Sequence, residues 1–126
     1  MFVQQAPRHF LDISQFNNST LRSILNKAIE FKKAGKNYDK PLLDHTLVLI
    51  FEKPSTRTRV SFEVGMQQLG GDVVVLGNRD SQLGQGESIS DTARVLSRFA
   101  DAIMIRTDSH QKLELLAEYS SVPVIN

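Results

Sequence analysis

Residues 51–59 read Phe-Glu-Lys-Pro-Ser-Thr-Arg-Thr-Arg and follow the unbroken apolar run Leu-Val-Leu-Ile at positions 47–50. A continuous apolar run is typical of a strand that is buried on both faces of a parallel sheet, and Pro54 ends it. The hydroxyl-bearing residues after the proline are favourable starting residues for a helix. The segment therefore predicts a strand that turns directly into a helix, as in an α/β fold.

The start of that expected helix suits an anion. The first four backbone N–H groups of a helix have no partner within it, and the helix dipole places about half a positive charge there. Ser55, Thr56 and Thr58 add hydroxyl donors, and Arg57 offers a planar fork of donors that matches phosphate oxygens. Arginine in a first turn opposes the dipole, so a bound dianion is the expected compensation. The alternative is an ordinary helix start whose arginines lie in solvent.

The rest of the chain alternates helical and extended patterns. Expected helices begin at Ser19 or Thr20, after Pro54 and at Ser88, and a fourth includes residues 112–119. Expected strands cover residues 47–51, 72–76, 102–105 and 122–125. Gly35 is expected to end the first helix, and Gly70 and Gly71 to turn the chain into the second strand. In the third helix the spacing predicts a buried stripe of Ile89, Ala93, Leu96 and Phe99.

Strands joined by helices favour parallel pairing with right-handed crossovers. We therefore predict a single α/β domain over residues 1–126, a three-layer sandwich with a mostly parallel sheet of about four strands. Open parallel sheets bind ligands at the carboxyl ends of their strands, where Arg57 and Arg106 both fall. The alternative for Arg106 is a surface ion pair with Asp108. Arg59 lies two residues from Arg57, on a different face of the helix, and is expected to pair with Glu63.

Composition excludes several classes of function. With 15 basic and 14 acidic residues the net charge is +1, which gives no field that would favour nucleic acid or an anionic membrane. There is no cysteine, and the three histidines are scattered without metal-ligand spacing, so no metal is expected. No apolar run approaches the length of a membrane span. We expect a soluble, cytoplasmic protein with a small-molecule partner.

Several stretches together resemble a known family. Ser-Thr-Arg-Thr-Arg at 55–59 is followed by Val-Ser-Phe-Glu at 60–63, Gly-Glu-Ser-Ile-Ser-Asp-Thr-Ala-Arg-Val-Leu-Ser-Arg occupies 86–98, and Asp-Ala-Ile-Met-Ile-Arg-Thr occupies 101–107. With Arg-His-Phe-Leu-Asp at 8–12, they resemble the carbamoyl-phosphate-binding domain of the aspartate and ornithine carbamoyltransferases. Lys53 is similar to the ornithine branch of that superfamily.

The resemblance implies a transferase that moves the carbamoyl group of carbamoyl phosphate to the side-chain amine of ornithine, giving citrulline and phosphate in arginine biosynthesis. Arg57 with Ser55, Thr56 and Thr58 would hold the phosphate, and Arg106 with the Thr58 hydroxyl would stabilise the oxyanion. Gln82 matches a ligand-contacting residue on a loop that crosses between subunits of a homotrimer. No cofactor is implied. Residue chemistry alone favours the alternative, in which Gln82 is a generic glutamine in a solvent loop.

The family carries a His-Pro-x-Gln motif beyond the position matching Asn126, and its amino-acid-binding motifs lie in a second domain. We therefore expect ornithine to bind through a domain that this sequence does not contain, and the 126-residue chain to be inactive alone. Two other classes remain open, a non-catalytic phosphate-binding module and an assembly domain. Within the enzymes, the aspartate and modified-ornithine branches also remain open.

Overall fold

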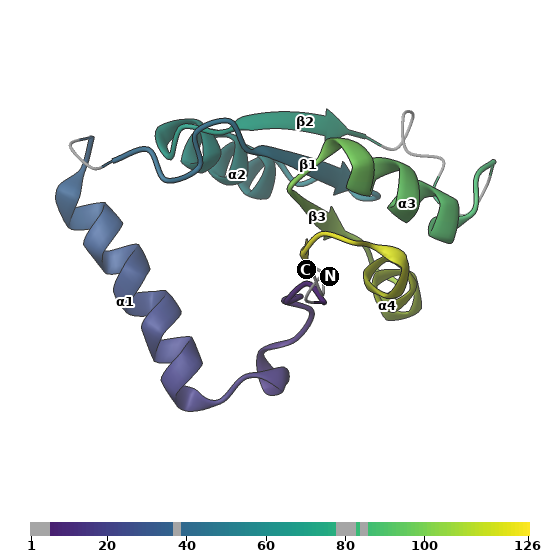
Figure 1. Cartoon of the computed structure of the whole chain (residues 1–126), viewed down its shortest axis with the longest axis horizontal. Helices are drawn as coiled ribbons and strands as arrows, with labels where there is room; N and C mark the ends of the chain where they lie inside the picture. Colours follow the sequence, from purple (N-terminus) through teal and green to yellow (C-terminus); the bar gives the residue numbers. More distant parts are fainter. Residues whose placement is uncertain (1–5, 37–38, 78–82, 84–85) are drawn as a thin grey trace, which may run out of the picture.

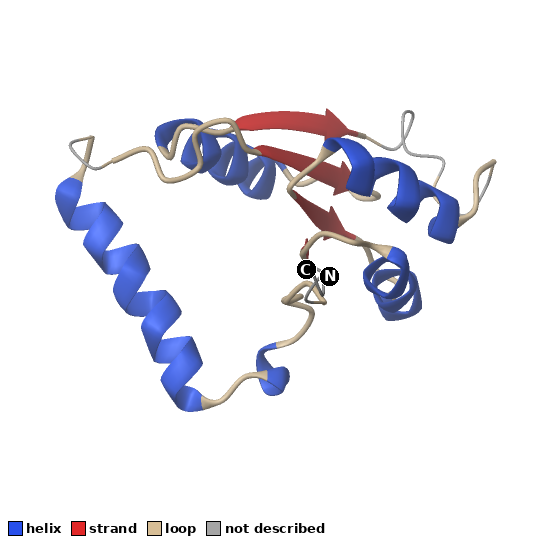
Figure 2. Cartoon of the chain, in the orientation of Figure 1, coloured by secondary structure: helices blue, strands red, loops and turns tan. Residues whose placement is uncertain are grey.

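The computed structural model describes residues 6–36, 39–77, 83 and 86–126. In chain order the elements are η1 (Ile13–Gln15), α1 (Asn18–Ala34), β1 (Thr46–Phe51), α2 (Thr56–Gln68), β2 (Asp72–Leu76), α3 (Ile89–Phe99), β3 (Ala102–Arg106), α4 (His110–Tyr119) and β4 (Val124–Ile125). Figure 1 shows their arrangement along the chain, and Figure 2 separates helices from strands.

The four strands form one sheet in the order β2-β1-β3-β4, and every neighbouring pair is parallel. The chain therefore steps outward from β1 to β2, crosses back over β1 to β3, and continues to β4. All four strands end at the same edge of the sheet, and the direction of stepping reverses between β1 and β3. The predicted parallel α/β sheet is confirmed.

Both faces of the sheet are covered, which explains the unbroken apolar run in β1. Leu47, Leu49 and Phe51 pack with Phe62 and Met66 of α2 on one face. Alternate residues of the same strand point to the other face, where Val48 and Ile50 join a cluster that includes Ala93 of α3 and Leu113 and Leu116 of α4. The sheet thus lies between α2 and the α3–α4 pair, as the three-layer prediction requires (Figure 1).

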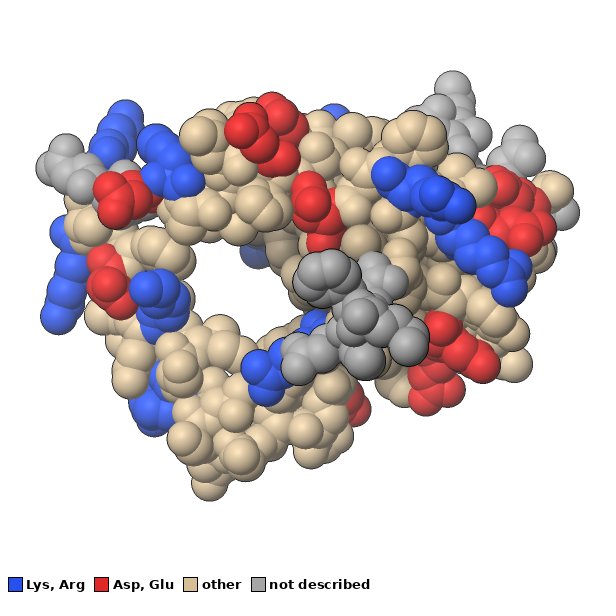
Figure 3. Space-filling view, viewed as in Figure 1, with Lys and Arg blue, Asp and Glu red and all other residues tan. Residues whose placement is uncertain are grey.

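Helix α1 stands apart from these layers (Figure 1), and none of its residues is buried in the described structure. The space-filling view shows an opening between α1 and the body of the domain (Figure 3).

The helix ends at Gly35 as predicted, with a φ of 62°, a left-handed value that glycine adopts without a side-chain penalty. Its start was predicted wrongly, because Asn17 rather than Ser19 or Thr20 is the N-cap: the Asn17 side-chain oxygen Oδ1 accepts from the Thr20 amide at 2.8 Å.

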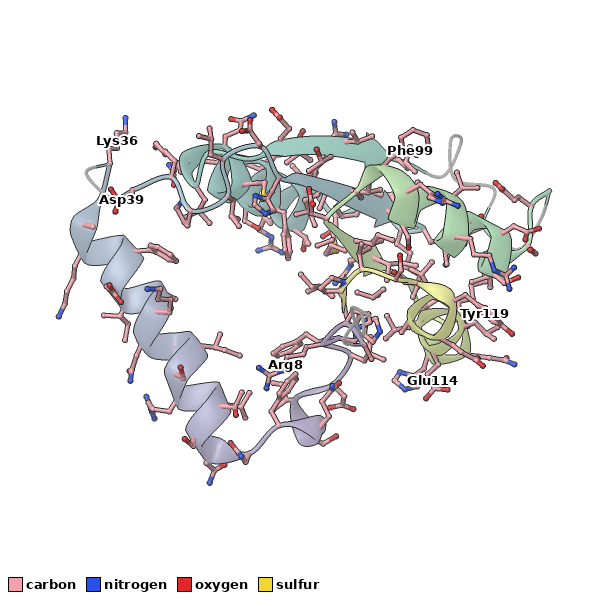
Figure 4. The ribbon with its side chains drawn as sticks, viewed as in Figure 1. Arg8, Lys36, Asp39, Phe99, Glu114 and Tyr119 are labelled. Atoms are coloured by element: carbon pink, nitrogen blue, oxygen red, sulfur yellow. The ribbon has the colours of Figure 1, made fainter. Side chains whose placement is uncertain are left out.

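In α3 the predicted start is confirmed: the Ser88 hydroxyl accepts from the Asp91 amide at 3.1 Å. The predicted stripe holds for Ala93 and fails for Phe99, which is 78% exposed and is labelled at the surface in Figure 4. A helix turns about 100° per residue, so Phe99 is rotated away from the stripe and Ala100 takes the inward position instead.

The fourth helix contains the predicted residues 112–119 and begins at His110, after the Ser109 N-cap. The fourth strand covers only residues 124–125, because Pro123 has no N–H to donate, and its carbonyl oxygen accepts from Ile103 instead. Gly70 has a φ of 95° and makes the predicted turn before β2.

The amino-terminal segment is bound to β4, the last strand. Phe10 donates to the carbonyl oxygen of Val124 and accepts from the Asn126 amide, each at 2.8 Å. The Val124 amide donates to Nδ1 of His9 at 2.9 Å, so this ring nitrogen carries no proton in the folded chain. Partial burial lowers the pKa of His9 below its ordinary value of 6.5.

This contact predicts a loss of stability on acidification. Because the folded pKa of His9 lies below the unfolded value of 6.5, the unfolded chain binds the proton more tightly. The stabilisation by neutral His9 is therefore complete above pH 6.5 and is lost as the pH falls toward the folded pKa. The free energy of unfolding, measured by urea titration from about pH 8 to about pH 5, should decrease.

Asparagine at this position offers a comparable acceptor that does not titrate, so His9→Asn should flatten the decrease. His110→Asn, at an exposed histidine on α4 that pairs with Glu114, is the matched control and should retain the parent's decrease below pH 6.5. An unchanged pH dependence in His9→Asn would exclude His9 as its source.

Candidate functional site

The carboxyl ends of β1 and β3 bring two separated segments together. Phe51, the last residue of β1, lies opposite Arg106, the last residue of β3. The pairing continues one residue further, because the Glu52 amide donates to the carbonyl oxygen of Arg106 at 3.0 Å. The connection from β1 to α2 and the connection from β3 to α4 are thus neighbours at the point where the stepping direction of the sheet reverses, which is where such sheets bind ligands.

The first turn of α2 leaves its amides available. Ser55 is the N-cap, yet its hydroxyl makes no capping bond and instead donates to the Thr58 hydroxyl at 2.9 Å. In α1, α3 and α4 the N-cap side chain accepts from a first-turn amide. The first turn of α2 also contains no acidic residue. Hydroxyls and amides therefore gather at a helix end whose dipole favours a negative charge.

Two arginines frame this region, and both side chains are exposed. Arg57 lies in the first turn of α2, and Arg106 ends β3. Within the described part of the chain neither has an ion-pair partner. Asp108, the alternative partner of Arg106, instead lies 3.3 Å from the Lys53 ammonium. A hydrogen bond from that ammonium lowers the pKa of Asp108.

Arg59 is oriented as the sequence predicted. Its Nε lies 3.2 Å from a carboxylate oxygen of Glu63, one turn along α2. The predicted pairing of Arg59 is therefore confirmed.

A hollow of about 290 Å³ opens beside the start of α2. Its polar lining comes from Lys53, Ser55, Thr56 and Arg59, and Phe51 is part of its apolar wall. Arg57 lies along a separate hollow on a different face of α2, with Thr56 and Val60. Of the predicted phosphate ligands, Ser55 thus lines the first hollow, Arg57 the second and Thr56 both, while Thr58 lines neither.

A polar cluster that the sequence does not predict joins the segment after β1 to the segment after β3. The Glu52 carboxylate accepts from the Thr107 hydroxyl at 2.5 Å and from the Lys112 ammonium at 2.9 Å. Only 16% of the Glu52 side chain is exposed. The sequence gives no signal for its partners, because they lie 55 and 60 residues away.

Gln82 lies outside the described residues. Among residues 6–36, 39–77, 83 and 86–126 no three metal-binding side chains lie together. No helix in this part of the chain is long and apolar enough to cross a membrane.

Comparison with known proteins gives one consistent family. Residues 8–126 match the family model of the aspartate/ornithine carbamoyltransferase carbamoyl-phosphate-binding domain. The ornithine carbamoyltransferase of Nitrobacter winogradskyi is 54% identical over 98% of this chain and 41% of its own length. That of Anoxybacillus flavithermus is 52% identical over 98% of this chain and 40% of its own. The chain thus spans about two-fifths of the length of these relatives.

Solved structures agree with the sequence matches. The ornithine carbamoyltransferase of Pyrococcus furiosus superposes with a TM-score of 0.93 at 48% identity, covering 99% of this chain and 41% of that one. The mitochondrial enzyme of Coccidioides immitis gives 0.89 at 37% identity, covering 97% and 40%. The paired strand ends, the open helix start and these matches lead to one conclusion: the chain belongs to the aspartate/ornithine carbamoyltransferase family, as its carbamoyl-phosphate-binding domain.

Proposed function

We propose that this chain holds carbamoyl phosphate at the start of α2 for transfer of the carbamoyl group to the side-chain amine of ornithine, with citrulline and phosphate as products. The observation that supports this proposal best is the junction of β1 and β3, where the hydroxyl-rich start of α2 and the Arg106 segment are neighbours. Ornithine would bind through the part of the relatives' length that this chain does not match. Residues 1–126 would then form one ligand-binding domain.

The proposed chemistry follows the development of negative charge. The amine nitrogen attacks the carbonyl carbon of carbamoyl phosphate, and the electrons of the C=O bond move onto its oxygen. When that oxyanion collapses, the bond from carbon to the phosphate oxygen breaks, phosphate leaves with the electron pair, and the amine loses a proton. Fixed cations and hydroxyls stabilise both charges without themselves reacting.

Each residue has a distinct place in this scheme. Arg106 and the Thr58 hydroxyl would stabilise the oxyanion, while Arg57 and the hydroxyls of Ser55 and Thr56 would hold the phosphate. The Ser55–Thr58 hydrogen bond brings the two hydroxyls together and leaves the Thr58 proton available to a ligand, whereas the Ser55 hydroxyl would have to turn from Thr58 to donate to the phosphate. Gln82 would reach the ligand of a neighbouring subunit in a homotrimer. The proposed setting is arginine biosynthesis in the cytoplasm.

Replacement of Arg57 by lysine tests the phosphate-binding role. Lysine keeps the charge and loses the planar fork, so Arg57→Lys should bind inorganic phosphate and carbamoyl phosphate about tenfold more weakly in titration calorimetry. Arg59→Lys is the matched control in the same turn. It should bind like the parent, and it should cost at most about 0.5 kcal/mol of unfolding free energy, because the Arg59 side chain is 55% exposed.

The opposite pattern would reverse the two assignments. If Arg59→Lys weakens phosphate binding and Arg57→Lys does not, the hollow lined by Arg59 is the anion site. If the parent chain binds neither phosphate nor carbamoyl phosphate, the proposed function itself fails. Binding of inorganic phosphate without binding of carbamoyl phosphate would favour the non-catalytic phosphate-binding module.

Turnover by the chain alone gives a second test. Carbamoyl phosphate binding without an ornithine site should give no citrulline above the uncatalysed background, because a held electrophile gains little rate without an oriented nucleophile. A colorimetric citrulline assay at saturating carbamoyl phosphate and ornithine would measure this. Citrulline production that depends on Arg106 would contradict the division of the two substrates between domains.

A further inference from the structure

We propose that Glu52, acting through Thr107 and Lys112, is a positioning residue that fixes the Arg106 segment against the start of α2. This inference rests on the proposed function, because it concerns how the two halves of the proposed anion site are held together. It assigns a role to three side chains that the substrate-binding scheme does not use.

The contacts form a closed circuit across the carboxyl edge of the sheet. The two oxygens of Glu52 are both occupied, Oε1 by the Thr107 hydroxyl and Oε2 by the Lys112 ammonium. The Thr107 oxygen also accepts from the Ser109 amide at 3.1 Å, and the Ser109 hydroxyl accepts from the Lys112 amide at 3.2 Å. The circuit joins the segment after β1, the segment after β3 and the first turn of α4.

The circuit extends the sheet beyond its last main-chain bonds. Backbone pairing ends with the bond from the Glu52 amide to the Arg106 carbonyl oxygen. One residue further on, only side chains connect the two segments. Thr107 both donates and accepts, so the direction of its hydroxyl is fixed. Charged hydrogen bonds away from water are stronger than exposed ones, and Glu52 and Lys112 are only 16% and 34% exposed.

The sign of the Glu52 charge distinguishes two possible roles for this residue, positioning of the Arg106 segment and direct attraction of the ligand. Glu52 carries a negative charge next to the segment that should bind a dianion, so its direct effect on the ligand is repulsive. Lys112 offsets this charge. If Glu52 is nevertheless required for anion binding, it acts through geometry rather than through attraction.

The chain provides a matched control. Lys53 and Asp108 join the same two segments one residue further out, at 3.3 Å, with side chains 57% and 67% exposed. Exposed pairs of this kind contribute little because water competes for both charges. Asp108→Asn should therefore leave phosphate binding within about twofold of the parent.

The decisive variants are Glu52→Gln, Thr107→Val and Thr107→Ser, each titrated with inorganic phosphate by calorimetry. Glu52→Gln removes the repulsive charge, so direct electrostatics alone would tighten binding, whereas loss of positioning should weaken it about fivefold. Thr107→Val keeps the shape and removes the hydroxyl, and should weaken phosphate binding to a similar extent. Thr107→Ser keeps the hydroxyl and should restore affinity close to that of the parent.

Hydrogen exchange of the Glu52 amide provides a readout in the absence of ligand. This amide is bonded to Arg106, so its exchange should accelerate in Glu52→Gln and Thr107→Val and stay near the parent rate in Thr107→Ser and Asp108→Asn. Unchanged or tighter phosphate binding in Glu52→Gln, or a Thr107→Val variant equal to the parent, would overturn the positioning role. Failure of the parent chain to bind phosphate would overturn the proposed function, and the positioning role with it.

Discussion

The parallel pairing of β1 with β3 is the constraint on which the rest of the structure depends. It places Phe51 opposite Arg106 although 55 residues separate them, and it joins the two halves of the apolar core. Both strands are largely buried, and helices cover both faces of the sheet, as is typical of parallel sheets. The crossover from β2 to β3 then directs the polar segments to a single edge. The architecture and the location of the candidate site thus have the same origin.

At that edge the local charge distribution runs against ordinary helix preferences. A helix start that carries arginine and leaves its N-cap hydroxyl out of the capping role is less favourable in isolation than the other α-helix starts in this fold. Such local departures are expected at functional sites, where stability is balanced against binding. Lys53 and Lys112 are compensated by carboxylates, whereas Arg57 and Arg106 have no ionic partner among the described residues.

The sequence predicts features that arise from short-range patterns. The β2 strand at 72–76, the Gly35 helix end and the Arg59–Glu63 pair each depend on residues within a few positions of one another, and each is confirmed. Phe99 was predicted wrongly because a stripe read from spacing alone does not show which residue takes its last inward position. The Glu52 circuit could not be predicted, because the registration of β1 with β3 creates it. The roles of the site residues, including Gln82, stay predictions.

Helix α1 differs thermodynamically from the other helices. With no buried residue, it receives little of the hydrophobic free energy that couples α2, α3 and α4 to the sheet. Most helical stability in proteins comes from tertiary packing of an apolar face rather than from intrinsic propensity, and the 17-residue α1 has little such packing. We therefore expect α1 to melt locally, in a transition separate from the global unfolding of the sheet.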